Sequence, residues 1–476
     1  MPTVKATTWN WAGWTPGESA LALLVGGFGL SLCLITVYQP ILLLALILAG
    51  MLAFLVFSRT SLCLKFALLL GGIPLESLGA SDVNPTQKPL LAGLGGTTVD
   101  GICLVVLSIC FAMLLLSSGR LSVPRGFRPY LYFVGFIAVS LLYSDSRLDG
   151  LRLVLKVAYP VLVFLVTAKA ITTQREIDSA FHYWIAGGLV ATISGAAVFL
   201  VRGATSFMFG GDFRYSSGLL YASPFSMYMF ALFGLCYGLW RGGRGGRYGV
   251  LGAIFGVQAL IAETRITWAA LLVGVLVIEG LMGQGTRKLL RVAGAVVLIG
   301  IASFYVMQNS IGLQRRLFGG ELDPGSSVVD MAQDINLSGR SVVWALTSAD
   351  YWSHNRWIGQ GAGSSGRLLA ATFDEASVPH NEYLRILHDT GIVGLALFLA
   401  GIIGLFRLLR PLLNKNITEQ QRICVKVALA LLAGYGIVAI SDNPLDYYLI
   451  FSQYVFFIAA VALAAFWGTN DIRLPQ

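Results

Sequence analysis

The stretch Thr390–Phe406, TGIVGLALFLAGIIGLF, decides the class of fold to which this chain belongs. It contains no charged residue and only one polar side chain, that of Thr390. A helix rises about 1.5 Å per residue, so a run of roughly 17–25 apolar residues is long enough to cross the hydrocarbon core of a bilayer. We therefore predict that this stretch is a membrane-spanning helix.

Comparable apolar runs recur along the whole chain. Of the 476 residues, 56% are hydrophobic and only 12% are charged, and the mean hydropathy is +0.74. A soluble protein carries about 25% charged residues, so this composition excludes a soluble enzyme, a disordered chain and a collagen-like repeat. The other candidate helices lie near 19–38, 39–57, 61–79, 99–117, 130–144, 151–170, 181–201, 218–240, 249–265, 266–283, 292–308, 427–441 and 447–467.

The runs predict an all-α polytopic membrane protein with about 12–14 transmembrane helices. Residues 1–308 would hold about eleven helices joined by short loops, and residues 390–476 about three more. Between them, residues 309–389 are polar and would form one large loop domain outside the membrane. Loops positioned by a rigid scaffold commonly carry function, so this segment is where we expect the site.

Lysine and arginine predict the orientation, because cytoplasmic loops are enriched in them. Alternate connections are basic, and we place those connections and both termini in the cytoplasm. The 309–389 loop would then face the periplasm, as in a multi-pass protein of the bacterial inner membrane. The net charge of +9 reflects these loops and not a nucleic-acid partner. The basic connections hold Arg120, Arg125, Arg128, Arg241, Arg244, Arg247, Arg287, Lys288, Arg291, Arg407, Arg410, Lys415 and Arg422.

Some arginines are predicted on the outer side, against this rule. Arg265 is the clearest, since Ala262–Arg265 separates two apolar runs with almost no loop. An ionisable group at that depth is costly and is kept for function or paired. Glu263 could be its partner, or the guanidinium could bind phosphate oxygens in a bidentate manner. The six cysteines show no metal-ligand spacing, and we expect no cofactor.

His380 is the candidate base among four histidines. Pro379 prevents a helix from continuing backwards and Asn381 suits an N-cap, so His380 stands at the start of a helix at the membrane edge. An imidazole can accept a proton near neutral pH. His388, two turns later, is the rival base, and Glu382 could orient His380.

The order His380-Asn381, then Gly391 and Gly394, resembles the signature of the O-antigen ligase and polymerase superfamily. In that family a histidine followed by Asn, Ser or Gln precedes a Gly-x-x-Gly that opens a membrane helix. Other resemblances fall in the same order as in the family and span roughly residues 200–445. They are Ser338–Trp344 for its arginine–tryptophan element, Ile358–Gly363 for its glycine-rich turn, and Arg214–Gly218 and Thr264-Arg265 for its arginine sites.

The resemblance implies a helical membrane glycosyltransferase of the GT-C type. Such proteins take a glycan from undecaprenyl pyrophosphate and transfer it to an acceptor sugar hydroxyl in the periplasm, with inversion and without a metal. Carried over, His380 would be the base, supported by Asn381, Trp344, Gly391 and Gly394. The pyrophosphate would be bound by Arg214, Arg265 and Arg340. Arg340 and Trp344 are one turn apart, so they could instead form a stacked structural pair.

Two activities within the family remain open. A polymerase of O-antigen or exopolysaccharide joins repeat units, and the stretches Asn336–Arg340 and Asp442–Leu445 favour it slightly. A ligase transfers the finished glycan to lipid A core of lipopolysaccharide. A chain-length regulator or a flippase would be a further partner in either case. Outside the family, a transporter of lipid-linked oligosaccharide is the main alternative, with Lys156 inside an apolar run as its best support, and a structural scaffold is the third.

Overall fold

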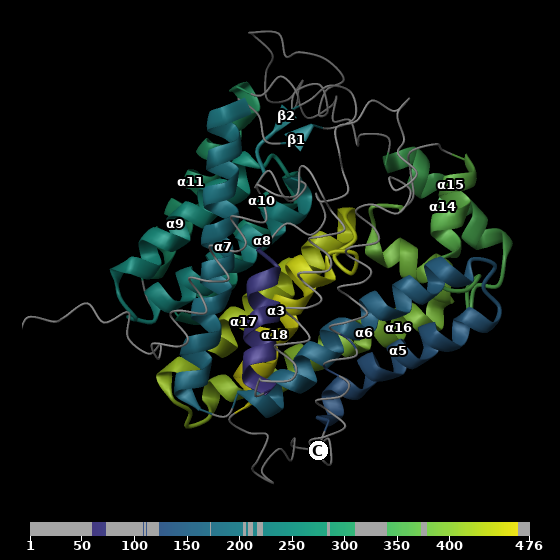
Figure 1. Ribbon diagram of the computed structural model, residues 1–476, viewed down its shortest axis with the longest axis horizontal. Coiled ribbons are helices and arrows are strands. Elements are labelled where there is room, and N and C mark those ends of the chain that lie inside the picture. The colour runs from purple at the N-terminus through teal and green to yellow at the C-terminus, as the bar shows by residue number, and fades with distance from the viewer. Residues whose placement is uncertain are drawn as a thin grey trace, which may run out of the picture.

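Every apolar run that falls within the described residues forms a helix (Figure 1). The structure is a computed structural model, and it describes residues 60–72, 108, 111, 123–171, 173–202, 206–207, 213–216, 222–282, 286–309, 340–372 and 378–464. The predicted helices at 19–38 and 39–57, most of the one at 99–117, and both termini lie outside these residues. Much of the polar loop, residues 310–339 and 373–377, also lies outside them.

The regular structure of the described residues is helical, apart from one antiparallel pair of two-residue strands. In that pair, β1 (Ser206–Phe207) lies against β2 (Phe213–Arg214). Short turns of other helix types adjoin several helices: η2 (Arg125–Phe127), η3 (Ser140–Leu142), η4 (Arg410–Asn414) and the π-turn η5 (Tyr448–Ser452). The α-helices are α3 (Thr60–Leu70), α5 (Arg128–Val139), α6 (Arg147–Ala170), α7 (Gln174–Arg202), α8 (Ala222–Arg241), α9 (Gly246–Ile261), α10 (Arg265–Met282), α11 (Thr286–Asn309), α14 (Arg340–Ser353), α15 (Ser364–Thr372), α16 (Glu382–Leu409), α17 (Glu419–Ser441) and α18 (Gln453–Ala464).

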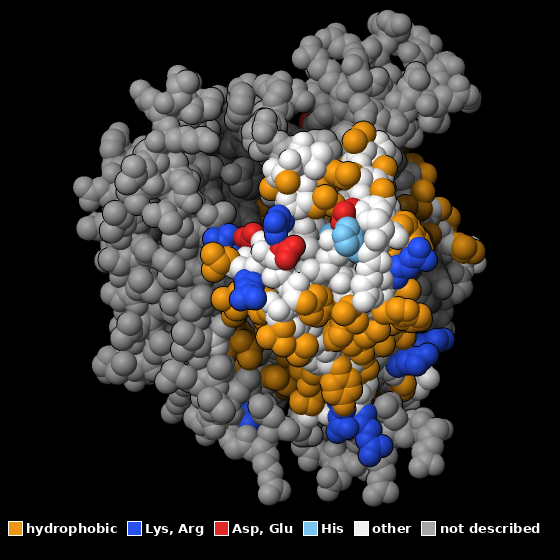
Figure 2. Space-filling model, turned by 90° about the vertical axis from the view of Figure 1, so that its right-hand side faces the viewer, with side chains coloured by type: hydrophobic (Ala, Val, Ile, Leu, Met, Phe, Trp, Pro, Cys, Tyr) orange, Lys and Arg blue, Asp and Glu red, His pale blue; other side chains and the backbone are white. Residues whose placement is uncertain are grey.

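Six helical stretches of the described residues are long and apolar enough to cross a membrane. They are α6, α8, α10, Leu289–Val306 of α11, Glu382–Asn414 and α17, so the protein is a multi-pass membrane protein. None of the Leu289–Val306 residues is buried in the protein, as expected for a helix surrounded by lipid. Figure 2 shows a belt of hydrophobic side chains on another face, with basic side chains below it and basic, acidic and histidine side chains above it.

The core is built around α18, which lies in the middle of the bundle between α6 and α17 (Figure 1). Every residue from Gln453 to Leu463 is buried, as expected for a helix that is apolar on all sides. The polar side chain of Gln453 is satisfied inside the core. The Tyr159 hydroxyl donates a hydrogen bond to its Oε1 over 3.0 Å, and its Nε2 donates to the Ala67 carbonyl over 3.1 Å.

Helix α16 approaches η2 and α5 through glycines. A β-carbon at Gly404 would lie 1.9 Å from the carbonyl oxygen of Gly126, and one at Gly401 would lie 2.7 Å from the β-carbon of Tyr130. Small residues allow such close packing of helices in lipid, where dispersion contacts replace the hydrophobic effect. The position of α16, and with it the position of its N-terminal end, therefore depends on this contact.

A kink at Gly391 divides α16 into two halves. Gly391 has φ 65° and ψ −169°, a left-handed backbone that breaks the helix. The backbone amides freed by the kink are satisfied by the turn before α15: Ile392 donates to the carbonyl of Arg356 over 2.9 Å, and Val393 donates to that of Trp357 over 3.1 Å. The kink thus docks the polar segment directly onto the membrane helix.

We expect Gly404→Ala to lower the free energy of unfolding by about 1–3 kcal/mol, because the added methyl group must displace the Gly126 backbone. Thermal or denaturant unfolding in detergent micelles would measure the loss. Gly135→Ala in α5 is the matched control, because a β-carbon there meets nothing within 4 Å. The control should be as stable as wild type or up to about 1 kcal/mol more stable. Equal stabilities for the two variants would contradict the packing described.

Candidate functional site

His380 lies immediately before α16 and is held in a strained backbone conformation. Its φ is +49°, and among the described non-glycine residues only His380 and Glu263 have positive φ. Such a conformation costs about 1–3 kcal/mol and persists only where neighbours impose it. Asn381 caps α16 by accepting a hydrogen bond from Leu384 N over 3.0 Å, and the Trp344 indole donates to the Pro379 carbonyl over 2.8 Å. These contacts fix the backbone on both sides of His380, whose side chain is 45% exposed.

Asp442 lies behind the imidazole. Its Oδ1 is 3.5 Å from His380 Nδ1, and the carboxylate is buried at the C-terminal end of α17. The same oxygen accepts hydrogen bonds from the Tyr447 hydroxyl over 3.2 Å and from the backbone amide of Asn443 over 2.9 Å. With Nδ1–H directed at this carboxylate, Nε2 is the nitrogen that can accept a proton. In this arrangement a buried carboxylate orients a partly exposed imidazole.

A chain of four charged side chains supports the loop that carries Asp442. Arg385 Nε donates to Glu382 Oε1 over 2.7 Å, and its Nη1 donates to Asp446 Oδ2 over 2.7 Å. The other Asp446 oxygen accepts from Lys156 Nζ of α6 over 2.8 Å. Burial alone would raise the pKa of Asp446, but the charges of Arg385 and Lys156 outweigh it and hold this pKa well below its usual value. We call these four residues the charge network.

Glu382 does not have the role that we considered for it. Its carboxylate bonds to Arg385 and accepts the Leu445 amide over 3.1 Å, which ties α16 to the 442–447 loop. The position facing His380 belongs to Asp442. Lys156, which we considered as support for a transporter, is paired with Asp446.

His388 is fully buried and joins three elements. Its Nε2 is 2.8 Å from Asp350 Oδ2 of α14, and its Nδ1 is 3.2 Å from Asp389 Oδ1. The Asp389 carboxylate also accepts the backbone amide of Ser365 at the start of α15 over 2.8 Å. Burial would raise the pKa of Asp350, but hydrogen bonds from Gln360 and His388 lower it below its usual value. His388 therefore has bonding partners on both nitrogens and no exposed surface, unlike His380.

The glycine-rich segment Ile358–Gly363 forms a turn, as the sequence predicted. Gly359, Gly361 and Gly363 all have left-handed backbones, with φ of 72°, 95° and 84°. The turn packs on the kink of α16, where a β-carbon at Gly391 would lie 2.3 Å from the carbonyl oxygen of Trp357. Gly394 begins the apolar half of α16, and a β-carbon there would meet the Thr390 hydroxyl at 1.9 Å.

Two of the three predicted arginines interact electrostatically. Arg265 begins α10 and Arg340 begins α14, and the positive charge of Arg340 acts on Arg265. Two cation–π pairs are found in the described parts of the chain, Arg247–Tyr248 and Arg356–Trp352, so Arg340 and Trp344 do not form one. Arg214 lies in β2, opposite Ser206; its side chain is outside the described part.

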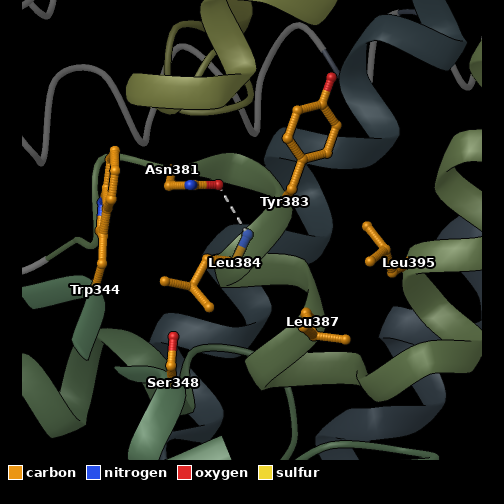
Figure 3. Close-up of a pocket in the computed structure, with 7 residues that line it drawn as sticks. All are labelled: Trp344, Ser348, Asn381, Tyr383, Leu384, Leu387 and Leu395. Atoms are coloured by element: carbon orange, nitrogen blue, oxygen red, sulfur yellow. Dashed lines mark hydrogen bonds between the residues drawn. The ribbon is translucent and has the colours of Figure 1, made fainter. Parts of the chain in front are cut away.

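An open groove of about 310 Å³ lies between α14 and α16, and Asn381, the residue after His380, is part of its lining (Figure 3). Figure 3 shows Trp344 on one side, Leu395 on the other, and the Asn381–Leu384 hydrogen bond between them. The lining is mainly apolar. It consists of Trp344, Ser348, Asn381, Tyr383, Leu384, Leu387 and Leu395.

Sequence reasoning missed Asp442 as the partner of His380. A signal was present, because Asp442-Asn443-Pro444 is a polar interruption between two apolar runs. A buried aspartate at such an interruption is rarely without a function or a partner. Its pairing with a histidine 62 positions away depends on the packing of α16 against α17.

We expect Asp446→Asn to lower the free energy of unfolding at pH 7 by about 1.5–3 kcal/mol, the usual range for hydrogen bonds to charged groups. The folded-state pKa of Asp446 is lowered, so the charge network contributes fully above the unfolded value of about 3.9 and is lost as the pH falls through the lower folded value. The difference between wild type and variant should stay constant from about pH 8 to about pH 5 and close in stronger acid.

Unfolding in detergent micelles at a series of pH values would measure this difference. The control is Asp149→Asn, which breaks an exposed ion pair with Arg152 and should cost at most about 1 kcal/mol. A difference that remained open in strong acid would show that the Asp446 charge is not what the network uses.

Comparison with known proteins finds a family match over part of the chain. Residues 250–399 match the family described as O-antigen ligase. The matched segment runs from α9 to the apolar half of α16 and includes Arg265, Arg340 and His380. No curated protein matches the chain. The match at residues 250–399 supports the resemblance of this segment to the O-antigen ligase and polymerase superfamily.

Proposed function

We propose that this protein is a membrane glycosyltransferase that moves a glycan from undecaprenyl pyrophosphate to a sugar hydroxyl of an acceptor. The family match supports glycosyl transfer in a membrane. The single observation that carries the proposal is the exposed, strained His380 backed by the buried Asp442. The electrostatic interaction of Arg265 with Arg340 adds to it. These parts correspond to a base and to fixed positive charge for a pyrophosphate leaving group.

In the proposed reaction His380 Nε2 takes the proton of the acceptor hydroxyl. The acceptor oxygen attacks the anomeric carbon of the donor from the side opposite the pyrophosphate. The bond between that carbon and the pyrophosphate oxygen breaks, and the oxygen leaves with the electron pair. One glycosidic bond forms with inversion, and the lipid pyrophosphate is released. The Asp442 carboxylate stabilises the imidazolium that forms during the transfer.

The two arginines act on the leaving group. Arginine stays protonated at any physiological pH, and its planar fork matches two phosphate oxygens. Two guanidinium groups that repel each other in the free protein gain stabilisation when an anion lies between them. Positive charge fixed in advance where negative charge develops is a large contribution to catalysis. Arg214, at the edge formed by β1 and β2, is our third proposed pyrophosphate ligand.

Polymerase and ligase differ only in the acceptor. We favour slightly an O-antigen or exopolysaccharide polymerase, with transfer to lipid A core as the alternative. In either case we propose that the protein lies in the bacterial inner membrane with His380 facing the periplasm. A transporter has less support, because the intramembrane Lys156 is accounted for by its ion pair with Asp446.

We expect His380→Ala to reduce transfer by about 10²–10⁴-fold, the usual contribution of a general base. The assay is proteoliposomes supplied with undecaprenyl-pyrophosphate-linked glycan and acceptor. Asp442→Asn keeps the shape of the side chain but removes its charge, and should have a smaller defect in the same direction. A ladder of product lengths would indicate a polymerase, and a single transfer to a distinct acceptor a ligase.

His354→Ala is the matched control for this experiment. His354 is half exposed, and its imidazole contacts Asp350, Ser353 and Gln360, away from His380. The control should keep wild-type activity. Transfer by His380→Ala at the wild-type rate would rule out His380 as the base.

We expect Arg265→Lys and Arg340→Lys each to reduce kcat/KM for the donor by roughly 10–100-fold. A lysine keeps the charge but not the bidentate fork, and charged hydrogen bonds contribute about 1.5–3 kcal/mol each. Arg367→Lys is the control, because Arg367 is exposed and pairs with Asp145 over 3.4 Å. Unchanged kcat/KM in both active-site variants would exclude pyrophosphate binding by this pair.

A further inference from the structure

The end of α16 that lies farthest from His380 carries exposed arginines, and so does the start of the helix packed against it. Arg407 lies in the last turn of α16, 25 residues after the first residue of that helix, which is about 38 Å along it. Arg407 and His380 are therefore at opposite ends of this membrane-spanning stretch. Four residues at this end, all exposed, form what we call the arginine cluster: Arg125 and Arg128 at the starts of η2 and α5, Arg407, and Arg410 at the start of η4.

Close backbone packing holds the two halves of the arginine cluster together. A β-carbon at Gly126, within η2, would lie 2.8 Å from Leu408 Cγ and 3.1 Å from the carbonyl oxygen of Gly404. Leu408 is the residue directly after Arg407. The start of α5 and the end of α16 cannot move apart without breaking this contact, so the positive charges share one patch with a fixed backbone.

No carboxylate within the described ranges neutralises the arginine cluster. Residues 121–144 and 390–418 contain no Asp or Glu, and none of the four guanidinium groups forms an ion pair or a hydrogen bond with a described residue. Other arginines do have acidic partners, since Arg241 and Arg291 both pair with the buried Glu279. Four like charges in one patch repel each other, and an anion from outside the chain would relieve that repulsion.

The dipole of α5 adds to the positive potential of the arginine cluster. Arg128 is the first residue of α5, whose first turn has no acidic residue and no side-chain cap. The unpaired amides of a helix N-terminus carry partial positive charge, which disfavours a cation and attracts an anion. The helix end and the guanidinium groups therefore favour the same ligand chemistry, that of a phosphate group.

Exposed apolar side chains lead away from the arginine cluster along both helices. Tyr132 is one turn after Arg128 in α5, and Ile403 is one turn before Arg407 in α16. Leu399 is one turn further along α16, and all three apolar side chains are exposed. Figure 2 shows this order on one face of the molecule, with basic side chains below a hydrophobic belt. A molecule bound here would meet positive charge at one end and an apolar surface beside it.

We propose that the arginine cluster binds the headgroup of a phospholipid with two phosphate groups, diphosphatidylglycerol, whose acyl chains lie along the exposed apolar side chains of α5 and α16. Basic clusters at a membrane surface attract anionic headgroups. Four guanidinium groups can give each of two phosphates a pair of bidentate donors. A soluble anion would leave the apolar side chains without a partner. The site lies at the other end of α16 from His380, so it is independent of the proposed function.

The test adds three lipids, at equal phosphate concentration, to purified protein in neutral detergent micelles: diphosphatidylglycerol, phosphatidylglycerol and phosphatidylcholine. Diphosphatidylglycerol should raise the melting temperature most and phosphatidylcholine least, and the shift should shrink at high salt because charges are screened. Equal shifts with diphosphatidylglycerol and phosphatidylglycerol would overturn the requirement for two phosphates. An equal shift with inorganic pyrophosphate would identify a site for soluble anions and overturn the lipid assignment.

Arg128→Gln and Arg407→Gln each remove one charge, from different halves of the arginine cluster. A basic residue near an anionic headgroup contributes about fivefold in affinity, so each variant should bind diphosphatidylglycerol about fivefold more weakly and the double variant roughly 25-fold. Lysine at both positions keeps the charges but not the bidentate forks and should lose less. Native mass spectrometry, which counts bound lipids, measures these affinities without a glycan donor.

Arg244→Gln is the matched control. Arg244 is exposed in the turn between α8 and α9 and lies outside the arginine cluster, so this variant loses the same charge and should keep the wild-type affinity. All these variants should melt at the wild-type temperature without lipid, because exposed substitutions change stability little. Wild-type affinity in the double glutamine variant, or a loss in Arg244→Gln equal to that in Arg128→Gln, would overturn the proposal.

Discussion

The charge network is the interaction on which the site depends. Glu382, Arg385, Asp446 and Lys156 alternate in sign, so each charged group of the network faces a group of the opposite sign. Removing two charges of each sign from water is costly unless every group is paired, and these groups pair across α6, α16 and the loop after α17. That requirement fixes the loop, and the loop carries the carboxylate that faces the imidazole.

A second constraint acts on the backbone. The kink at Gly391 leaves backbone groups of α16 without helical partners. The carbonyls of Arg356 and Trp357 accept hydrogen bonds from two of its amides, and the amides of Gln360 and Gly361 donate to two of its carbonyls. A helix cannot be broken near lipid unless other groups bond to the freed backbone. The polar segment is consequently attached to α16 at a defined height. His380 lies on one side of the kink, and the apolar half of α16 lies on the other. The groove is lined by Asn381 on the first side and by Leu395 on the second.

The sequence predicted the helices better than the contacts between them. Hydropathy located the helices, and the order Pro379, His380, Asn381 predicted the start of α16 because capping is a local property. Two interactions join segments that are far apart in the chain, and both depend on packing. They are the electrostatic interaction of Arg340 with Arg265 and the contact of Asp442 with His380. His388 is fully buried and His380 is partly exposed. The spacing of residues in a sequence does not predict such a difference in burial. The N-terminal helices and residues 310–339 lie outside the described part, so those predictions stand as made.

The Arg265–Arg340 pair also bears on turnover under the proposed function. Transfer removes the glycan but leaves the pyrophosphate on its lipid, so the spent carrier keeps the charge that the arginines bind. The same electrostatic attraction that assists bond breaking then opposes product departure, and in many enzymes departure of product sets the overall rate. A carrier with a long hydrocarbon chain would leave sideways into the bilayer rather than into water. The pace of glycan synthesis would then follow the exchange of lipids at the edge of the protein.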